Sequence, residues 1–434
     1  MTPALETFGV HRARGDGSLM MEDVSLGSIA DRFGTPCFVY SKAALTAAFL
    51  RLDGALKAAR NGRPYLICYA VKANSNLSVL KLFAGLGAGF DIVSGGELMR
   101  VLEAGGDPRK VVFSGLGKTA VEMKMALEAN IKCFNVESET ELERLNQVAA
   151  RLGAKARISV RVNPDVDAKT HPYISTGLKN NKFGIAFDRA LDVYRRARSL
   201  SHIQIAGVDC HIGSQLTDDA PLREAMALIV SLADALQKDG IALHHICPGG
   251  GIGIVYRDEP TIDVELYAQA LEESLGDRSV ELLLEPGRML VGNAGVLLSR
   301  VEFVKPTDTR NFLVIDAAMN DLIRPSLYQA HHEVVMVGAP RADTAERIYD
   351  VVGPVCESTD VLAHQRALAS REGDVVAILS AGAYSFVMSS NYNSRPRAAE
   401  VMVDGDQALL VRGRETFDDL VRHERLQTIQ AKLY

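Results

Sequence analysis

Lys72 is the residue whose position in the sequence most directly suggests chemistry. It lies in Tyr69-Ala70-Val71-Lys72-Ala73-Asn74, directly after the apolar run Leu66-Ile67-Cys68, which is typical of a buried strand. A lysine at the carboxyl end of such a strand is partly desolvated, which lowers its pKa and favours the neutral amine needed for a Schiff base. The competing interpretation is an ammonium that simply reaches solvent at the strand end. Lys72 is therefore a candidate for capturing a carbonyl cofactor.

Two later stretches have the composition of a phosphate-binding site. Gly249-Gly250-Gly251-Ile252-Gly253 follows an apolar strand, and consecutive glycines let backbone N–H groups approach a phosphate without hindrance from a Cβ atom. A tight turn without a ligand is the alternative, because the spacing does not match the dinucleotide-binding G-x-G-x-x-G pattern. Glu285-Pro286-Gly287-Arg288 ends another strand and offers a carboxylate, a glycine turn and a guanidinium together.

A phosphate that belongs to pyridoxal phosphate would give Glu285 a specific task. A carboxylate beside the ring nitrogen keeps that nitrogen protonated, which makes the ring a strong electron sink and favours carbanion chemistry. His211, in Gly207-Val208-Asp209-Cys210-His211-Ile212-Gly213-Ser214-Gln215, ends a further strand and could lie against the ring face. A core histidine with ordinary hydrogen-bonding partners is the competing interpretation.

The second half of the chain adds a candidate acid and a candidate carboxylate clamp. Cys356, in Cys356-Glu357-Ser358-Thr359-Asp360, has carboxylates as neighbours, which favour the protonated thiol and suit it to giving up a proton. A buried structural thiol is the alternative. Arg324-Pro325-Ser326-Leu327-Tyr328 supplies a second guanidinium beside that of Arg288, and two guanidiniums can hold a carboxylate bidentately. Such a pair suggests a substrate with a carboxylate remote from its reacting carbon.

The elements that must position these residues follow a repeated βα pattern between residues 40 and 288. Eight strands are predicted, at Leu66–Tyr69, Gly89–Val93, Val111–Ser114, Cys133–Val136, Ile158–Val162, Ile205–His211, His244–Cys247 and Glu281–Glu285. Helices are predicted between them, at Leu77–Gly85, Gly96–Ala104, Ala120–Ala129, Glu137–Leu152, Phe187–Ser199, Ala220–Lys238 and Asp263–Leu275. Because polar residues follow the carboxyl ends of many strands, a (β/α)8 TIM-like barrel is favoured over a doubly wound sheet.

Beyond residue 290 the pattern changes to period-two runs separated by Gly, Pro and Asp turns. These runs predict antiparallel strands at Leu297–Val304, Phe312–Asp316, Ile348–Val352, Val375–Leu379 and Ala399–Val403. Leu5–Val10 and Leu19–Met21 are short enough to be edge strands of the same all-β domain. The predicted organisation is therefore N-terminal strands over residues 1–36, an α/β barrel over 37–288 and a C-terminal β-barrel or β-sandwich over 289–434.

The composition excludes several classes of function. With 434 residues and a net charge of −6, the chain has no basic stripe for nucleic acid or an anionic membrane. The six cysteines are scattered without a C-x-x-C pair, which argues against a metal site and against a disulfide framework and fits a reducing compartment. No signal peptide or apolar run of about 18 residues is present, so we expect a cytoplasmic protein.

Taken together and in order, these motifs resemble the diaminopimelate decarboxylases. The resemblance runs from about residue 35 to 400 and includes Lys72, Cys356-Glu357-Ser358 and the stretches His171-Pro172-Tyr173-Ile174-Ser175-Thr176-Gly177, His211-Ile212-Gly213-Ser214-Gln215, Gly249-Gly250-Gly251 and Glu285-Pro286-Gly287-Arg288. It implies a pyridoxal 5'-phosphate enzyme with an alanine-racemase-like barrel, a β domain and active sites shared across a homodimer interface. The implied reaction is decarboxylation of meso-diaminopimelate to L-lysine, the last step of lysine biosynthesis.

The resemblance also implies a role for each site residue. Lys72 would hold the cofactor covalently, His211 would stack on its ring and Arg161 would lie close to it. The phosphate and ring nitrogen would be bound by Ser214, Gly249, Gly250, Gly251, Glu285, Gly287 and Arg288, with Tyr384 closing over the phosphate. The distal carboxylate of the substrate would be gripped by Arg288, Arg324 and Tyr328, and its distal ammonium would meet Glu357, with Tyr384 nearby. Cys356 of the other subunit would protonate the carbanion left after CO2 departs.

Three rival functions use related folds. An ornithine or arginine decarboxylase acts on a substrate with a cationic far end, which Arg288 and Arg324 would repel. Amino-acid racemases use an arginine in the place of Glu285. Noncatalytic pyridoxal-phosphate-binding proteins of the small barrel type lack a second domain, whereas this chain continues far beyond residue 290.

Overall fold

A computed structural model describes residues 4–167 and 181–426, so the motif His171–Gly177 lies outside the described residues. Within these residues, eight parallel strands pair in a closed ring, because β8 pairs with β9 as well as with β7. They are β5 (Tyr65–Ala70), β6 (Gly89–Ile92), β7 (Val111–Phe113), β8 (Cys133–Val136), β9 (Ala156–Asn163), β11 (Ile203–Cys210), β12 (His245–Cys247) and β13 (Glu281–Leu284). The short strand β10 (Ile185–Ala186) pairs with β9 outside the ring. The predicted TIM-like barrel is confirmed.

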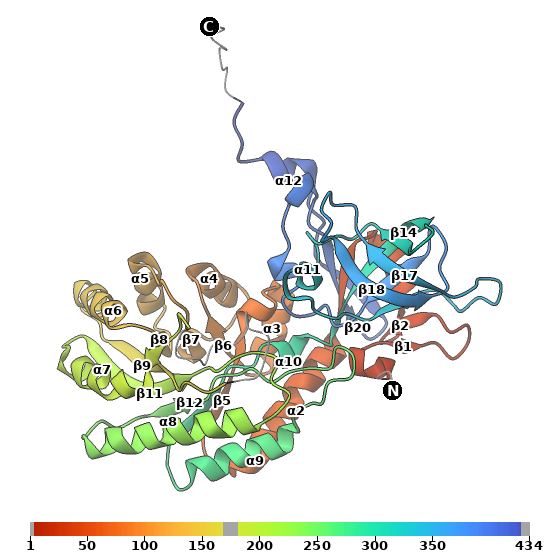
Figure 1. Cartoon of the computed structure of the whole chain (residues 1–434). Coiled ribbons are helices and arrows are strands. Elements are labelled where there is room, and N and C mark those ends of the chain that lie inside the picture. The colour runs from red at the N-terminus through yellow and green to blue at the C-terminus, as the bar shows by residue number, and fades with distance from the viewer. Residues whose placement is uncertain (1–3, 168–180, 427–434) are drawn as a thin grey trace.

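Helices surround the barrel strands (Figure 1). They are α2 (Lys42–Arg60), α3 (Leu77–Gly85), α4 (Gly95–Glu103), α5 (Ala120–Glu128), α6 (Glu139–Arg151), α7 (Phe187–Ser199), α8 (Ala220–Lys238) and α9 (Val264–Leu275). Several of these helices begin with a side-chain N-cap. Ser94 Oγ accepts from the Glu97 backbone N–H at 3.2 Å, and Ser138 Oγ accepts from the Glu141 backbone N–H at 3.1 Å. The loops from strand to helix are short and end at these capping residues. The carboxyl ends of the strands and the amino ends of the helices therefore lie at the same end of the barrel, its mouth.

The interior of the barrel has an apolar layer and a polar layer. Six side chains form the apolar cluster inside the ring, namely Leu66, Cys68, Val112, Cys133, Cys247 and Leu283. Nearer the carboxyl ends of the strands lie buried polar groups, including Asp91, Asn135, Asp209 and Glu285. Because a buried polar group is costly unless it is paired, this layer marks the part of the barrel that is built for chemistry.

The second unit is a mixed sheet with the strand order β18-β17-β15-β14-β4-β20-β21; β19 also pairs with β14, and β16 pairs with β19. Its strands are β4 (Cys37–Ser41), β14 (Gly295–Pro306), β15 (Asn311–Ile315), β16 (Val334–Met336), β17 (Arg347–Val352), β18 (Val361–Leu368), β19 (Val375–Ile378), β20 (Ala399–Asp404) and β21 (Gln407–Arg412). The prediction of purely antiparallel strands is wrong for two pairs, because β15 with β17 and β20 with β4 are parallel. Long connections rather than hairpins join the members of each parallel pair.

Cys37–Ser41 was expected at the start of the barrel, but it pairs with β14 and β20 of the mixed sheet instead. The chain therefore enters the barrel through α2 and β5. The limits of the domains otherwise stay a prediction.

The N-terminal segment differs in part from the prediction. Leu5–Phe8 is a 3-10 helix (η1) rather than a strand, and it ends at Gly9, whose φ of 69° is left-handed. A small sheet follows, made of β1 (His11–Arg12), β2 (Leu19–Met21) and β3 (Val24–Ser25). Apolar side chains of this segment share one core cluster with side chains of β4, β14, β19 and β20. The N-terminal residues thus pack on the mixed sheet.

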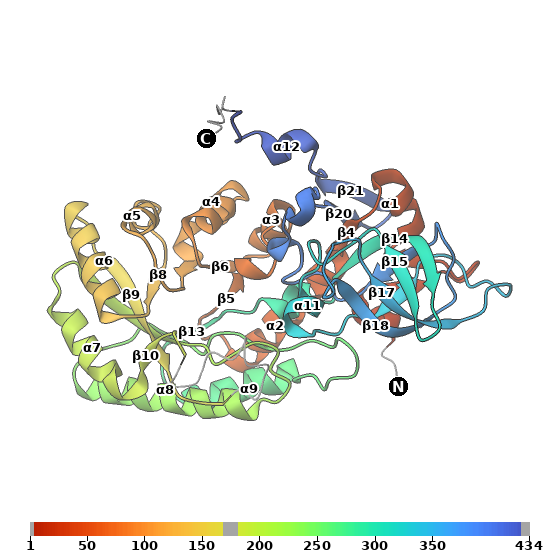
Figure 2. The same cartoon turned by 45° about the horizontal axis from the view of Figure 1, so that its top comes forward.

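The barrel and the mixed sheet lie side by side, with short helices between and beside them (Figure 2). These include α10 (Arg288–Val291) and α11 (Arg324–Tyr328), while α1 (Leu26–Phe33) packs on the sheet and α12 (Phe417–Val421) follows it. In the part of the chain that the structure describes, no helix is long and apolar enough to cross a membrane.

Candidate active site

Lys72 lies in a single 3-10 turn, η2 (Val71–Ala73), immediately after β5. Its Nζ donates to Oδ2 of Asp91 at 2.9 Å, and Asp91 is fully buried in the neighbouring strand β6. Burial on its own lowers the pKa of Lys72, but the charges of Asp91, Tyr384 and Glu285 and the hydrogen bond to Asp91 together outweigh it, so the pKa rises above its usual value. The predicted lowering is therefore wrong, because it considered desolvation without an ion-pair partner on the next strand.

Glu285 follows β13 and lies in a cluster of buried carboxylates. Its Oε1 accepts from Nδ2 of Asn135 at 3.0 Å. Burial, together with the negative charges of Asp209 and Asp91, raises the pKa of Glu285 well above its usual value. Burial also raises the pKa of Asp209 to about 6. Neither carboxylate oxygen of Asp209 has a hydrogen-bond partner among the described residues. A proton or a cation beside Glu285 would therefore be favoured in this cluster.

The glycine loop packs tightly between the ends of β11 and β13. A Cβ atom added at Gly250 would lie 2.0 Å from the carbonyl oxygen of Glu285, and one at Gly249 would lie 2.3 Å from that of Cys210. Gly251 has a φ of +103°, which L side chains rarely adopt. These positions require glycine for steric reasons, so the backbone itself forms the surface that faces the barrel mouth.

His211 lies against this loop. The Gly250 N–H donates to its Nδ1 at 3.4 Å. Burial and the positive charge of Arg161 lower the pKa of His211 well below its usual value, which keeps the ring neutral. Arg161, in β9, forms an ion pair of 3.0 Å with Glu137, and its guanidinium carbon lies 4.8 Å from the ring centroid of Phe183. Both predicted residues therefore lie at the same mouth as Glu285.

Arg288 and Arg324 converge where the barrel meets the mixed sheet. Arg288 donates from Nη1 to the Tyr256 hydroxyl at 2.5 Å and from Nη2 to Ser214 Oγ at 3.0 Å. The guanidinium carbon of Arg324 lies 4.6 Å from the ring centroid of Tyr256. Both arginines are buried, and among residues 4–167 and 181–426 neither forms a salt bridge to a carboxylate.

Tyr384 connects the arginine pair to the lysine turn. Its backbone N–H donates to the carbonyl of Ala73 at 2.8 Å, and its ring centroid lies 4.8 Å from the guanidinium carbon of Arg288. Its hydroxyl would lie 3.2 Å from a Cβ atom placed on Gly287. Tyr328, at the end of α11, is half-buried. The structure thus groups these predicted residues beside Lys72.

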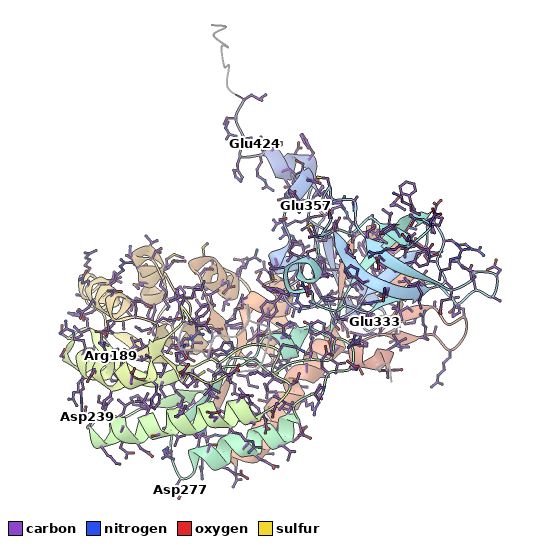
Figure 3. The ribbon with its side chains drawn as sticks, in the orientation of Figure 1. Arg189, Asp239, Asp277, Glu333, Glu357 and Glu424 are labelled. Carbon is purple, nitrogen blue, oxygen red and sulfur yellow. The ribbon has the colours of Figure 1, made fainter. Side chains whose placement is uncertain are left out.

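Cys356 and Glu357 are exposed, in contrast to the residues above. The Cys356 thiol donates to Asn393 Oδ1 at 3.4 Å, and Glu357 Oε1 accepts from the Tyr392 hydroxyl at 2.6 Å. These contacts connect the two residues to a loop before β20 rather than to the barrel mouth, and Figure 3 shows Glu357 on the mixed-sheet side of the molecule. Within this chain they are not part of the cluster around Lys72.

Comparison with known proteins decides which family has this arrangement. Residues 46–292 match the model for the pyridoxal binding domain of pyridoxal-dependent decarboxylases. The diaminopimelate decarboxylase of Pseudomonas aeruginosa is 58% identical, over 95% of this chain and 98% of the relative. The chain belongs to the diaminopimelate decarboxylases. It is therefore a pyridoxal-phosphate-dependent carboxy-lyase, and the predicted family, enzyme class and cofactor are confirmed.

Solved structures agree with this family. The diaminopimelate decarboxylase of Helicobacter pylori complexed with L-lysine superimposes with a TM-score of 0.88 at 43% identity, covering 92% of this chain and 98% of that chain. The enzyme from M. jannaschii in complex with L-lysine gives a TM-score of 0.91 at 36% identity, covering 96% and 98%.

The residues at the barrel mouth fit pyridoxal phosphate. The side-chain-free glycine loop suits a phosphate, and the cluster of buried carboxyl groups suits a protonated ring nitrogen beside Glu285. Lys72, in the turn after the neighbouring strand β5, has an amine that suits the aldehyde of this cofactor. The donor set of this decarboxylase therefore matches the chemistry of its cofactor.

Four residues of the site were missed from the sequence. Asp91 is a single acid in the apolar run Gly89-Phe90-Asp91-Ile92, and that pattern was an available signal. Asn135 likewise interrupts an apolar strand. Tyr256 and His332, whose Nε2 lies 2.8 Å from Nη1 of Arg324, lie in connecting segments without any period, so only the packing of the two units reveals them.

Proposed function

We propose that this enzyme decarboxylates meso-diaminopimelate to L-lysine and CO2, and that Arg288 and Arg324 bind the carboxylate that the product keeps. The observation that carries this proposal is the pair of buried guanidiniums that both contact Tyr256, with no salt bridge to a carboxylate among the described residues. Buried cations of this kind are costly unless an anion pairs with them. The far carboxylate of the substrate is such an anion.

An ornithine or arginine decarboxylase is the second candidate, because it shares the fold and the cofactor. Its substrates carry a cation at the far end, which would face two arginines in a buried site. The repulsion would leave three like charges together without a counterion. The arginine pair therefore favours the diacid substrate.

Pyridoxal phosphate supplies an electron sink for the bond that breaks. Lys72 would hold it through Nζ, and Glu285 would keep a proton at the ring nitrogen. His211 would lie on the ring, Arg161 beside it, and the phosphate would be bound by Ser214, the Gly249–Gly251 loop, Gly287, Arg288 and Tyr384. Tyr328 would join the arginines at the distal carboxylate. Anchoring the far end fixes which bond lies perpendicular to the ring, so it selects the reaction as well as the substrate.

We also propose that the enzyme is a homodimer in which Cys356 and Glu357 act in the site of the other copy. Both are exposed on their own chain, so they are available to a second one. Large apolar side chains are exposed on α4 and α5 near the barrel mouth, with Met99 61% and Val121 68% exposed. In that arrangement Cys356 gives its proton to the reacting carbon, and Glu357 pairs with the distal ammonium.

A cytoplasmic location completes the proposal. Five of the six cysteines are buried, and all six are free thiols. This usage fits a reducing compartment.

The test of the reaction is CO2 release by the enzyme loaded with pyridoxal phosphate from meso-diaminopimelate, L-ornithine and L-arginine in parallel. We expect release from meso-diaminopimelate alone, with an equal amount of L-lysine. Release from ornithine or arginine would keep the cofactor and overturn the roles of Arg288, Arg324 and Glu357.

Shared sites are tested by mixing two inactive variants, Lys72→Ala and Cys356→Ala. A hybrid dimer has one site in which both residues are intact, so activity should return on mixing. Mixtures that exchange subunits and stay inactive would place both residues in the site of one chain.

A further inference from the structure

His332 lies behind the arginine pair and has no role in the function proposed above. It belongs to the segment that connects α11 to β16, and its side chain is completely buried. Nδ1 lies 2.8 Å from the carbonyl oxygen of Leu379, and Nε2 lies 2.8 Å from Nη1 of Arg324. A carbonyl only accepts and a guanidinium only donates, so Nδ1 must carry the proton and Nε2 must accept. The imidazole is therefore neutral and in a single tautomer.

The electrostatics agree with this tautomer. Burial and the positive charge of Arg324 lower the pKa of His332 well below its usual value. A protonated ring would have no lone pair left for the guanidinium. His332 thus acts as a fixed hydrogen-bond acceptor for one nitrogen of Arg324.

Tyr256 fixes the other side of the same guanidinium. Its ring meets that of His332 edge-on, with centroids 5.4 Å apart and an interplanar angle of 77°. The ring lies under Arg324, and its hydroxyl accepts from Arg288 at 2.5 Å. The segment that carries Tyr256 is itself held, because its backbone N–H donates to Glu259 at 2.8 Å. Arg324 is therefore held from below and from one edge.

We propose that His332 is a positioning residue that sets selectivity for a substrate with a distal carboxylate, by holding the Arg324 guanidinium against repulsion from Arg288. This inference rests on the proposed function. The two guanidiniums contact the same tyrosine ring, so each repels the other. Without an acceptor on its far edge, Arg324 is free to turn away from Arg288, and the bidentate grip on a carboxylate is lost. Tyr256 alone cannot prevent this, since a ring face fixes the plane of a guanidinium but not its rotation within that plane.

The neighbouring His331 provides a matched control. It interacts with Arg366 and Glu333, and its side chain keeps 22% exposure. It is the same residue type one position earlier in the chain, but within the described part of the structure it forms no hydrogen bond to Arg324. A loss that follows from disturbing this segment in general would appear in both histidine variants.

The test compares L-lysine with cadaverine, two molecules that differ by the carboxylate in question. Their dissociation constants are measured by titration calorimetry on the enzyme loaded with pyridoxal phosphate. In His332→Leu, we expect lysine to bind about tenfold or more weakly, the size of a lost hydrogen bond to a charged group, and cadaverine to change by less than about twofold. His331→Leu should leave both constants, and the absorbance of the bound cofactor, at the wild-type values.

Two further variants keep the test decisive. His332→Gln retains an amide oxygen that can accept from Arg324, so it should restore most of the preference for lysine. If His332→Leu fails to bind the cofactor, His332→Met fills the same volume with a flexible apolar chain and takes its place. A preference for lysine that is unchanged in the apolar variant, or equal weakening of both ligands, overturns the role of His332. Failure of the proposed function would look different, because the wild type itself would then show no preference and release no CO2 from meso-diaminopimelate.

Discussion

Replacing Gly250 with alanine tests the glycine loop most directly. The added Cβ would lie 2.0 Å from the carbonyl oxygen of Glu285 and 2.7 Å from its carbonyl carbon, and real Cβ contacts essentially never fall below 3.0 Å. The two backbones must therefore separate by about 1 Å, and they resist this because the Glu285 N–H donates to the Gly249 carbonyl at 2.8 Å. Overpacking of this kind costs about 1–3 kcal/mol of folding free energy.

The same shift moves the N–H groups that would face the phosphate. A displacement of about 1 Å in a group of binding residues can cost about 100-fold in rate or affinity. We therefore expect Gly250→Ala to raise the dissociation constant of pyridoxal phosphate by about 10- to 100-fold. The assay is fluorescence titration of the cofactor-free variant with pyridoxal phosphate, with the midpoint of thermal unfolding measured in parallel.

Gly54→Ala is the control for this change. Gly54 lies inside α2 with nothing within 4 Å of an added Cβ, so the substitution should stabilise the fold by up to about 1 kcal/mol and leave the cofactor affinity unchanged. Wild-type affinity and midpoint in Gly250→Ala would refute the argument that the loop is rigid against β13.

Three further changes test single residues. In Lys72→Ala, borohydride reduction should fix no cofactor on the chain, whereas in the wild type it should label the peptide that contains Lys72; a label on another lysine would move the attachment site. Cys356→Ala should keep the absorbance of the bound cofactor and lose about 100- to 10,000-fold in turnover of meso-diaminopimelate, and a normal rate would remove this thiol from the mechanism. Burial raises the pKa of Glu97 to about 7 from a usual value of 4.5, so its protonated form stabilises the fold below pH 4.5 and that contribution disappears as the pH rises through 7. Glu97→Gln keeps an acceptor for the Val93 N–H but cannot ionise. Between about pH 5 and 8 the free energy of unfolding of the wild type should therefore fall by about 1–3 kcal/mol relative to that of this variant. If the unfolding free energies of the two proteins change with pH in parallel, the raised pKa of Glu97 is contradicted.

The sequence was sufficient to predict the barrel because each strand is a short apolar run bounded by helix signals. Lys72, His211, the glycine loop and Glu285 could be grouped for the same reason, since the carboxyl ends of parallel strands meet at one mouth. What failed depends on contacts between distant segments. The pairing of β5 with β6 brings Asp91 to Lys72, and Asp91 with Tyr384 and Glu285 raises the pKa of Lys72 that burial alone would lower. The parallel pairing of β4 with β20 likewise has no local signal, because the register covers residues 37–41 and 399–403.

The buried charges of opposite sign lie in different parts of the molecule. The barrel mouth holds a cluster of buried carboxyl groups, in which burial and the charges of Asp209 and Asp91 raise the pKa of Glu285, and this favours a cationic ring nitrogen. The boundary with the mixed sheet holds the opposite charge, since Arg288 comes from the barrel side and Arg324 from α11. Arg324 and its acceptor His332 belong to the second unit, so under the proposed function the far carboxylate would be held away from the acids and the substrate would bind in only one direction.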